Sequence, residues 1–341
     1  MQQNTSLKPY NTFGIDATAQ YFASFSRVEE LGTLLEYRNN LSVGGMQAPL
    51  LVLGGGSNIL FTKNVAGLVL KNELKGIELI KEDADYYYIK AAAGEVWHDL
   101  VMYCVENNYA GLENLSLIPG NVGASPIQNI GAYGVEIKDV FYQLEAYHIQ
   151  HHAIDIFGKD DCSFGYRESI FKQELKGQYI IVSVTFRLPK KPVLNISYGA
   201  IKEELENMKV QDVSIKNISQ AVINIRSSKL PDPKQIGNAG SFFKNPTVSK
   251  FRRHVIVEEF PKLVSYQVDE MYYKLAAGWL IEQCGWKGYR KGDAGCHEKQ
   301  ALVLVNYGGA KGEEIIALSQ EIIASVEKKF GVVLEREVNV V

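Results

Sequence analysis

The sequence lacks several features that would assign it to a common class of protein. No run approaches the roughly 18 apolar residues of a membrane-spanning helix, and the first residues have neither a basic start nor an apolar core. We therefore expect no membrane span and no secretory signal peptide. Lysine and arginine number 36 against 39 acidic residues, a net charge of -3. This balance excludes a general basic surface for nucleic acid or an anionic membrane, so any anionic ligand must be held by local cations.

Cysteine and proline are also scarce. The four cysteines form no CxxC pair, which argues against a zinc site and against a disulfide framework and favours a reducing cytoplasm. We expect no metal site. Only ten prolines and 46% hydrophobic residues predict a chain that is globular throughout. Its 341 residues exceed what one hydrophobic core usually supports, so we expect two or three subdomains.

What the sequence does have is a glycine-rich stretch at 118–135, IPGNVGASPIQNIGAYGV. It is not a P-loop, because no Lys followed by Ser or Thr closes it, and its glycines do not follow GxGxxG. Glycine allows positive φ and close backbone approach, so successive N–H groups could form a cradle for a diphosphate. Taken alone, the stretch is equally compatible with an ordinary glycine-rich surface loop.

A second glycine cluster lies upstream, in LVLGGGSNIL at 51–60. Here a short apolar strand runs into three glycines, then Ser57 and Asn58. Two such loops would suit a large dinucleotide with a pyrophosphate at its centre. The pair therefore predicts a dinucleotide cofactor.

The hydrophobic pattern predicts mixed α and β structure. We expect strands at 19–23, 51–53, 67–70, 86–92, 140–150, 178–188 and 301–306. We expect helices at 26–37, 94–108, 274–284 and 312–329, and 219–227 is either helical or extended. Two prolines in 189–192 indicate a linker. These patterns predict three domains: 1–72 with the tail 330–341 returning near it, 73–190, and 191–329.

Six blocks of the sequence resemble the UDP-N-acetylenolpyruvoylglucosamine reductase family: LGGGSN, IPGNVGASPIQNIGAYG, FGYRES, SKLPDPK, NAGSFFKNP and HEKQALVLVN. They span 51–306 in the family's order, and LEREV at 334–338 extends the match. NISYG at 195–199 resembles the Tyr-bearing loop of the longer subgroup. The resemblance implies an α+β protein, with a two-subdomain FAD-binding fold of the p-cresol methylhydroxylase and vanillyl-alcohol oxidase type. A C-terminal α+β substrate-binding domain completes it.

The resemblance also implies a reaction. FAD would be bound non-covalently and reduced by NADPH as co-substrate. The reduced flavin would then convert UDP-N-acetylglucosamine enolpyruvate to UDP-N-acetylmuramate in peptidoglycan synthesis. The expected protein is a cytoplasmic monomer whose partner is this small-molecule substrate, with no nucleic acid and no membrane.

Three residues match the family's catalytic positions. Arg167 would contact the substrate carboxylate, Ser241 would donate the proton, and Glu337 would help to stabilise the enediolate. Without the family, the residues alone favour a surface ion pair with Glu168 for Arg167 and a turn serine before two core phenylalanines for Ser241. The segment departs from the family at Arg336, where a proline is usual, so Glu335 is a second candidate for the carboxyl.

Other positions match binding residues. For the sugar nucleotide these are Tyr166, Tyr198, Arg226, Lys229, Asn245 and Gln300. For FAD they are Gly54, Gly55, Gly56, Ser57 and Asn58 in the first loop and Gly120, Gly123, Ala124, Ser125 and Gln128 in the second. No histidine is needed as a base, and His151 and His152 are expected to be exposed.

Two other functions fit a flavin fold. One is an oxidase or dehydrogenase of a small alcohol or hydroxy acid; such enzymes often tether the flavin through His or Cys, and neither glycine loop contains one. The other is a flavin- or nucleotide-binding module without catalysis.

Overall fold

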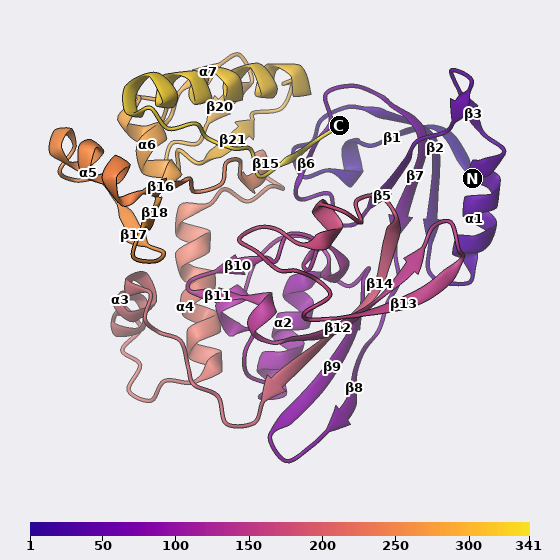
Figure 1. The fold of residues 1–341 in the computed structure, drawn as a ribbon, viewed down its shortest axis with the longest axis horizontal. Coiled ribbons are helices and arrows are strands. Elements are labelled where there is room, and N and C mark those ends of the chain that lie inside the picture. Colours follow the sequence, from indigo (N-terminus) through magenta and orange to yellow (C-terminus); the bar gives the residue numbers. More distant parts are fainter. The chain divides into compact units, whose positions relative to one another are not determined.

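A computed structural model describes residues 1–341, which form two compact units. The first unit contains 1–5, 19–55 and 65–228, and the second contains 6–18, 56–64 and 229–341. Both combine helices and strands (Figure 1), as expected for an α+β protein. The predicted domain limits near 72 and 190 stay a prediction.

The first sheet of unit 1 is mostly parallel. Its strands in spatial order are β1 (Gln2–Ser6), β2 (Thr18–Phe25), β7 (Val65–Asn72) and β5 (Leu50–Leu53). Both β2 and β5 run parallel to β7, and α1 (Glu30–Asn39) lies between β2 and β5 in the chain. The helix begins at Glu30 rather than at the predicted Ser26, because the Glu30 carboxylate accepts the Ser26 N–H at 2.9 Å before the first turn.

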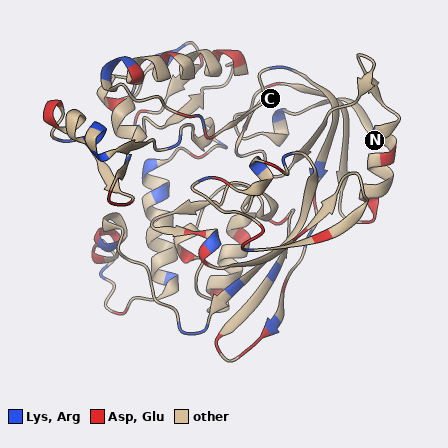
Figure 2. Cartoon of the chain, viewed as in Figure 1, with Lys and Arg blue, Asp and Glu red and all other residues tan.

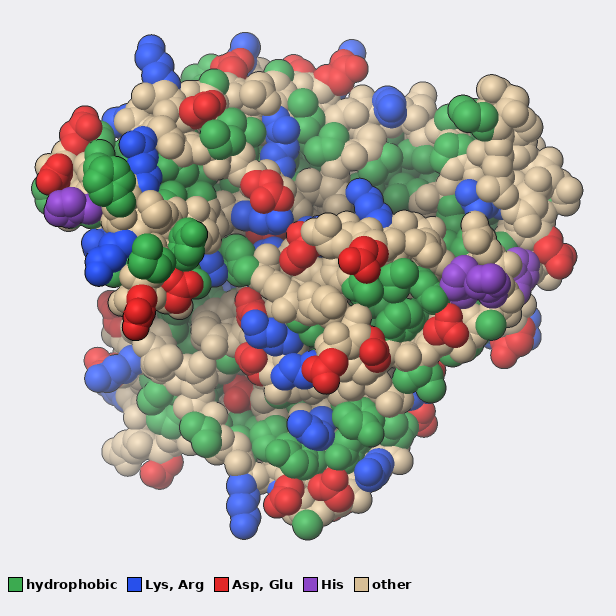
Figure 3. Space-filling view, in the orientation of Figure 1, with side chains coloured by type: hydrophobic (Ala, Val, Ile, Leu, Met, Phe, Trp, Pro, Cys, Tyr) green, Lys and Arg blue, Asp and Glu red, His purple; other side chains and the backbone are tan.

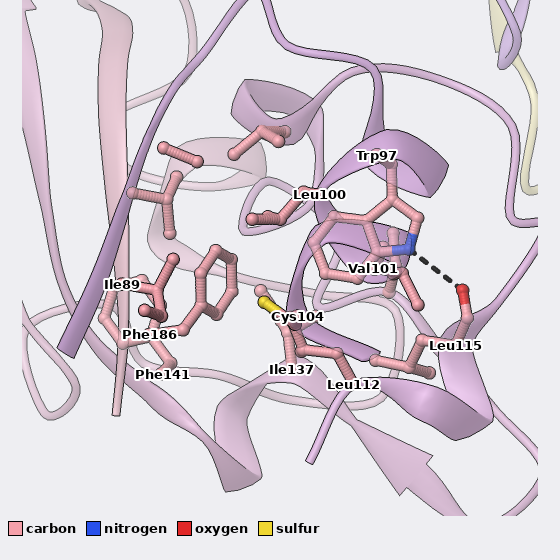
Figure 4. Close-up of a cluster of buried hydrophobic side chains, with 14 of the residues drawn as sticks. Ile89, Trp97, Leu100, Val101, Cys104, Leu112, Leu115, Ile137, Phe141 and Phe186 are labelled. Atoms are coloured by element: carbon pink, nitrogen blue, oxygen red, sulfur yellow. Dashed lines mark hydrogen bonds between the residues drawn. The ribbon is translucent and has the colours of Figure 1, made fainter. Parts of the chain in front are cut away.

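The second sheet of unit 1 is antiparallel and covered by a helix. Its strands in order are β13 (Ala153–Gly158), β12 (Phe141–His148), β14 (Tyr179–Pro189), β9 (Tyr86–Ala92) and β8 (Ile77–Glu82). The apolar face of α2 (Trp97–Glu106) packs on it. Trp97, 1% exposed, contacts the Phe186 ring edge-on at 5.7 Å between centroids and donates its indole N–H to the Leu115 carbonyl at 2.9 Å (Figure 4). This core fixes the segments on either side of the second glycine loop.

Two further helices complete unit 1. They are α3 (Gly199–Asn207) and α4 (Ile215–Lys229), which share a small apolar cluster that includes Ile201 and Val222. The undecided segment 219–227 is therefore helical, and α3 was missed by the sequence pattern. The small elements of this unit are β3 (Ser42–Val43), β4 (Met46–Gln47), β10 (Gly131–Ala132) and β11 (Val135–Glu136).

Unit 2 has two small sheets and three helices. The strands of the larger sheet are β15 (Gly237–Ser241), β21 (Val303–Asn306), β20 (Ala294–Cys296) and β19 (Arg290–Lys291). The three-stranded sheet has β16 (Thr247–Ser249), β18 (Tyr272–Leu275) and β17 (Ser265–Gln267). The helices are α5 (Lys250–Glu259), α6 (Ala277–Gln283) and α7 (Gly312–Phe330). A parallel pair joins β6 (Ile59–Leu60) to β22 (Asn339–Val340).

Charged side chains of both signs are interspersed over the elements (Figure 2). No helix combines the length and apolar character that crossing a membrane requires. No group of three His, Cys, Asp or Glu side chains is placed to hold a metal ion. Burial raises the pKa of the Cys104, Cys162 and Cys296 thiols to about 12.

Histidine side chains gather over the turn between β12 and β13 (Figure 3). His148 is buried, and its Nδ1 accepts the N–H groups of Gln150 and His151. His151 and His152 are exposed, which confirms that prediction. The cluster serves the turn rather than catalysis, because its buried member is a hydrogen-bond acceptor for the turn's own backbone.

Candidate active site

The first glycine loop follows β5 directly. Gly56 has φ +63°, and a Cβ there would lie 2.0 Å from the Tyr10 carbonyl oxygen. The Gly56 carbonyl accepts the Thr12 N–H at 3.0 Å. Only glycine fits this position, because a side chain would collide with backbone that cannot retreat without losing that bond.

The two glycine loops touch. A Cβ at Gly55 would lie 2.9 Å from the Gly120 Cα and 2.7 Å from the Asn121 Oδ1. Gly120 has φ +115°, a conformation that favours glycine. The structure thus brings together the two loops that the sequence placed far apart in the chain.

The second loop is anchored along 93–97. The Trp97 N–H donates to the Gly120 carbonyl at 2.9 Å, and the Asn121 side-chain amide donates to the Gly94 carbonyl at 2.7 Å. The N–H groups of 122–125 donate in chain order to the carbonyls of Glu95, Ala93, Asn121 and Val122. The binding of a diphosphate by this loop stays a prediction, but these four N–H groups are not open donors for it. Their backbone is bonded within the fold, so small side chains rather than open amides define this surface.

A cavity of about 240 Å³ borders both loops within unit 1. Gly54 lines it from the first loop, and Gly123 and Ala124 line it from the second. The remaining walls are mainly apolar and come from Leu50, Val52, Asn72, Ala93, Ile127, Ile149, Phe171, Leu175, Gly177, Tyr179, Ile180 and Ile181. Apolar walls next to glycine backbone suit a flat heteroaromatic ring attached to a phosphate. Most of these wall residues were missed in the sequence, because isolated apolar residues in strands and loops look like ordinary core.

Arg167 lies at the tip of a tight turn. Gly165 and Glu168 are paired across it, and Arg167 itself has φ +55°, which is unusual for a residue with a side chain. Its guanidinium donates to the Gly131 carbonyl at 2.6 Å and lies 5.5 Å from the centre of the Tyr166 ring. The half-buried Arg167 is therefore directed at the end of the second glycine loop rather than out to solvent.

Arg226, Tyr133 and Tyr198 form a second group in unit 1. The Arg226 Nε donates to the Leu117 carbonyl at 3.2 Å, and its side chain is hydrogen-bonded to Tyr133. Burial lowers the pKa of Arg226, and the same burial raises the pKa of Tyr133. Tyr198, just before α3, sets its ring edge-on to the Tyr133 ring at 5.2 Å. Tyr133 was missed in the sequence, although its position between two glycines could have indicated a presented aromatic ring.

In unit 2, Ser241 ends a bulged strand. Pairing between β15 and β21 shifts register between Asn238 and Ser241, and Gly240 in the bulge has φ +69°. A bulge of this kind re-aims the side chain that follows it. The Glu337 N–H donates to the Phe242 carbonyl at 2.8 Å, so the Glu337 backbone lies beside the residue next to Ser241.

The structure separates the two carboxyl candidates. The Glu335 side chain is 72% exposed and forms an ion pair with Lys244 at 2.5 Å. Glu337 is half-buried in the segment before β22, and its backbone passes Phe242. Arg336 between them turns toward α7, where its guanidinium donates to the Ser319 Oγ at 2.8 Å and the Gln320 Oε1 at 2.9 Å. The unusual Arg336 thus anchors this segment to a helix.

Two of the three remaining predicted residues of unit 2, Asn245 and Gln300, lie near each other at the start of α6, and the third, Lys229, does not join them in the described contacts. The Asn245 Oδ1 accepts the Ala277 N–H at 2.9 Å. The Gln300 Oε1 packs against Gly278, so closely that a Cβ added to Gly278 would lie 2.9 Å from it. Both side chains therefore meet the start of α6. Lys229, the last residue of α4, is exposed.

Comparisons with known proteins identify the family of the chain. A family model described as the C-terminal domain of UDP-N-acetylenolpyruvoylglucosamine reductase matches 232–341, and one described as an FAD binding domain matches 21–148. The UDP-N-acetylenolpyruvoylglucosamine reductase of Flavobacterium johnsoniae is 51% identical over 100% of this chain and 99% of its own length. That of Amoebophilus asiaticus is also 51% identical, with the same coverage. The chain belongs to the UDP-N-acetylenolpyruvoylglucosamine reductase family.

A crystal structure of the Thermus caldophilus member of this reductase family has the same fold. It is 24% identical, the alignment covers 98% of this chain and 97% of that one, and the TM-score is 0.67. Together with the two family models, this similarity confirms the predicted fold: an FAD-binding portion followed by the C-terminal domain of the reductase family.

Proposed function

We propose that this chain catalyses the NADPH-dependent reduction of UDP-N-acetylglucosamine enolpyruvate to UDP-N-acetylmuramate, with FAD as its cofactor. Full-length identity of 51% to named reductases carries this assignment. The match of an FAD binding domain to 21–148 supports the flavin, because that range contains both glycine loops.

The residues of the two glycine loops fit FAD. A Cβ at Gly55 would collide with Gly120 and Asn121, so glycine at this position lets the backbones of the two loops pack together, and the diphosphate would bind along the joined loops. The apolar cavity beside Gly54 and Gly123 would take the adenosine half. The proposed contacts are Gly54, Gly55, Gly56, Ser57, Asn58, Gly120, Gly123, Ala124, Ser125 and Gln128. Neither loop contains a His or Cys, which supports non-covalent binding and disfavours a flavin-tethered oxidase.

The chemistry demands that negative charge be stabilised. When bound and reduced, FAD supplies the hydride for the terminal carbon of the enolpyruvyl group. The electron pair of the alkene then moves onto the adjacent carboxylate, which becomes an enediolate dianion. Arg167 would hold this group, since a guanidinium stays charged and binds two oxygens at once.

A proton must then reach the neighbouring carbon. Ser241 would donate it: a hydroxyl is a weak acid, but the carbon is strongly basic, so position matters more than activation. The bulge at Gly240 supports this role because it sets the direction of the Ser241 side chain. Glu337 would hydrogen-bond the enediolate in its protonated form.

The sugar nucleotide would contact Tyr166, Tyr198, Arg226, Lys229, Asn245 and Gln300. Tyr198 would close over the diphosphate, and Lys229 would offset its charge. We further propose that the protein acts as a cytoplasmic monomer, where NADPH and the nucleotide substrate are both available.

The test is a two-step flavin titration without oxygen. NADPH should bleach the yellow protein, and UDP-N-acetylglucosamine enolpyruvate should then restore the colour with formation of UDP-N-acetylmuramate. Bleaching without recovery would reject the reductase. Bleaching of the oxidised flavin by a small hydroxy acid or alcohol in place of NADPH would favour the alternative oxidase class, and no bleaching by either reductant would favour a binding module.

A further inference from the structure

Asn129 is a buried polar residue that the proposed reaction does not use. Its side chain is 0% exposed, and its backbone has φ +42°. Asparagine tolerates this left-handed region better than most residues. It lies in the glycine-rich stretch, two residues before Gly131.

The side chain of Asn129 is fully engaged. Its Nδ2 donates to the Gly165 carbonyl at 2.9 Å and to the Glu136 Oε2 at 2.9 Å. Its Oδ1 accepts the Lys138 N–H at 3.2 Å. The two donors of the amide and its acceptor oxygen are thus all satisfied, which fixes the amide in one orientation.

The link between Asn129 and the Arg167 turn runs in both directions. Asn129 holds the carbonyl of Gly165, two residues before Arg167. Arg167 in return donates from Nη2 to the Gly131 carbonyl at 2.6 Å and from Nη1 toward the Asn129 carbonyl at 3.5 Å. The turn and the end of the glycine loop are therefore joined by side chains from each.

Such support has a physical purpose. Arg167 has φ +55°, a conformation that costs about 1 kcal/mol or more for a residue with a side chain. It persists only where neighbouring bonds enforce it. A guanidinium that must meet a developing charge is effective when it is oriented before the reaction, and a displacement of about 1 Å can cost about 100-fold in rate.

We propose that Asn129 is a positioning residue that orients Arg167 toward the substrate carboxylate. This inference rests on the proposed function, in which Arg167 contacts that carboxylate. Asn129 itself touches neither substrate nor cofactor in this account. It acts by fixing the Gly165 carbonyl and hence the backbone of the turn.

The experiment is a double-mutant cycle with Asn129→Gly and Arg167→Ala. Glycine removes the side chain without left-handed strain. Stopped-flow spectra of the FAD-loaded protein separate flavin reduction by NADPH from reoxidation by the enolpyruvyl substrate. Asn129→Gly should slow reoxidation about 10- to 100-fold and leave flavin reduction within about twofold. In the Arg167→Ala background it should add no more than about twofold, because the residue it positions is gone.

A structural role alone would give a different pattern. Equal slowing of both half-reactions, or the same slowing with and without Arg167, would overturn the positioning role, as would an unchanged reoxidation rate. If Arg167→Ala itself leaves reoxidation unchanged, the proposed role of Arg167 fails as well. A slow Arg167→Ala together with a normal Asn129→Gly would reject only the present inference.

Two variants guard against misfolding. Asn129→Asp keeps the shape and the acceptor for Lys138 but replaces the donor with a carboxylate facing the Gly165 carbonyl and Glu136. It should slow reoxidation at least as much as Asn129→Gly, and normal reoxidation would count against the proposal. Asn108→Gly is the matched control, because Asn108 also has positive φ, +60°, but is exposed after α2. Its reoxidation should match the unmodified protein.

Discussion

The ring of Tyr198 meets the ring of Tyr133 edge-on, with centroids 5.2 Å apart and planes at 89°. The segment before Tyr198 is tied to the same glycine loop, since the Asn195 side-chain amide donates to the Gly134 carbonyl at 3.1 Å. An aromatic pair of this geometry contributes about 0.5–1.5 kcal/mol. Tyr198 remains 40% exposed, so its contact with Tyr133 is weak enough for a ligand to replace it.

Tyr198→Ala should therefore weaken binding of the sugar nucleotide more than it affects NADPH. We expect the dissociation constant of the enolpyruvyl substrate to rise about tenfold, the loss of one hydrogen bond to the diphosphate, while flavin reduction by NADPH changes less than twofold. Titration of the flavin spectrum measures the first and stopped-flow absorbance the second. Tyr142→Ala is the control, because Tyr142 is 37% exposed and makes a similar edge contact with Tyr88 at 4.9 Å. Unchanged substrate affinity in Tyr198→Ala would show that Tyr198 does not contact the bound sugar nucleotide.

Ser241→Ala should separate the two halves of the catalytic cycle. Loss of a general acid slows the step it serves by about 100- to 10,000-fold, so reoxidation by substrate should fall by that factor. Flavin reduction by NADPH should remain close to normal, since no proton is delivered to the substrate there. Rapid-mixing traces of the flavin absorbance would report both half-reactions. Equal damage to the two half-reactions would rule out an acid role for Ser241.

Glu337→Gln and Glu335→Gln should behave differently. Glu337 lies half-buried beside the Ser241 strand, and we expect its substitution to slow reoxidation about 100-fold or more. Glu335 is exposed and paired with Lys244, so Glu335→Gln should change reoxidation less than about threefold. Single-turnover kinetics on both variants makes the comparison. A larger effect at Glu335 would transfer the catalytic role to that carboxyl.

His98 predicts a pH dependence of stability. Its Nδ1 accepts the Leu117 N–H at 3.0 Å, and burial lowers the pKa of His98. A lowered pKa means that the folded protein favours neutral imidazole. The stabilisation is complete above the unfolded pKa of about 6.5 and is lost as the pH falls through the lower folded value. Burial lowers the pKa of His297 too, so both residues contribute in the same direction.

Thermal melting from pH 8 to pH 5 checks this. The melting temperature should fall below about pH 6.5, and His98→Asn should fall less steeply because an amide oxygen accepts the same N–H without titrating. An identical slope in His98→Asn would assign the effect to His297 or to other groups.

Regular elements could be predicted well from the sequence where one physical cause dominates. The strand at 86–92 and the helix from Gly312 were placed correctly, because periodic apolar residues decide both. The helix α3 was missed because only Ile201 and Leu205 are buried in it, too few for a periodic pattern. Here tertiary packing on α4 decides, and single-chain periodicity cannot report it.

The site, like the fold, has features that the sequence predicts and features that depend on tertiary contacts. Glycine composition identified both loops, because close backbone approach requires glycine at Gly55 and Gly56. It could not show that the N–H groups of 122–125 are bonded to 93–95 and their own turn, since such bonds depend on which segments meet in space. The positions of Asn129 and Tyr133 depend on the same long-range contacts.

The interleaved path of the chain limits how the protein can be dissected. Unit 2 recruits 6–18 and 56–64, and its C-terminal part depends on them: the Asn306 amide donates to the Phe13 carbonyl at 2.9 Å, and β22 pairs with β6. A fragment beginning at Lys229 would expose the surfaces that these short segments cover. A chimera of two family members would therefore fold only when 6–18 and 56–64 come from the same parent as 229–341. A single crossover near residue 229 would separate segments that pack on one another.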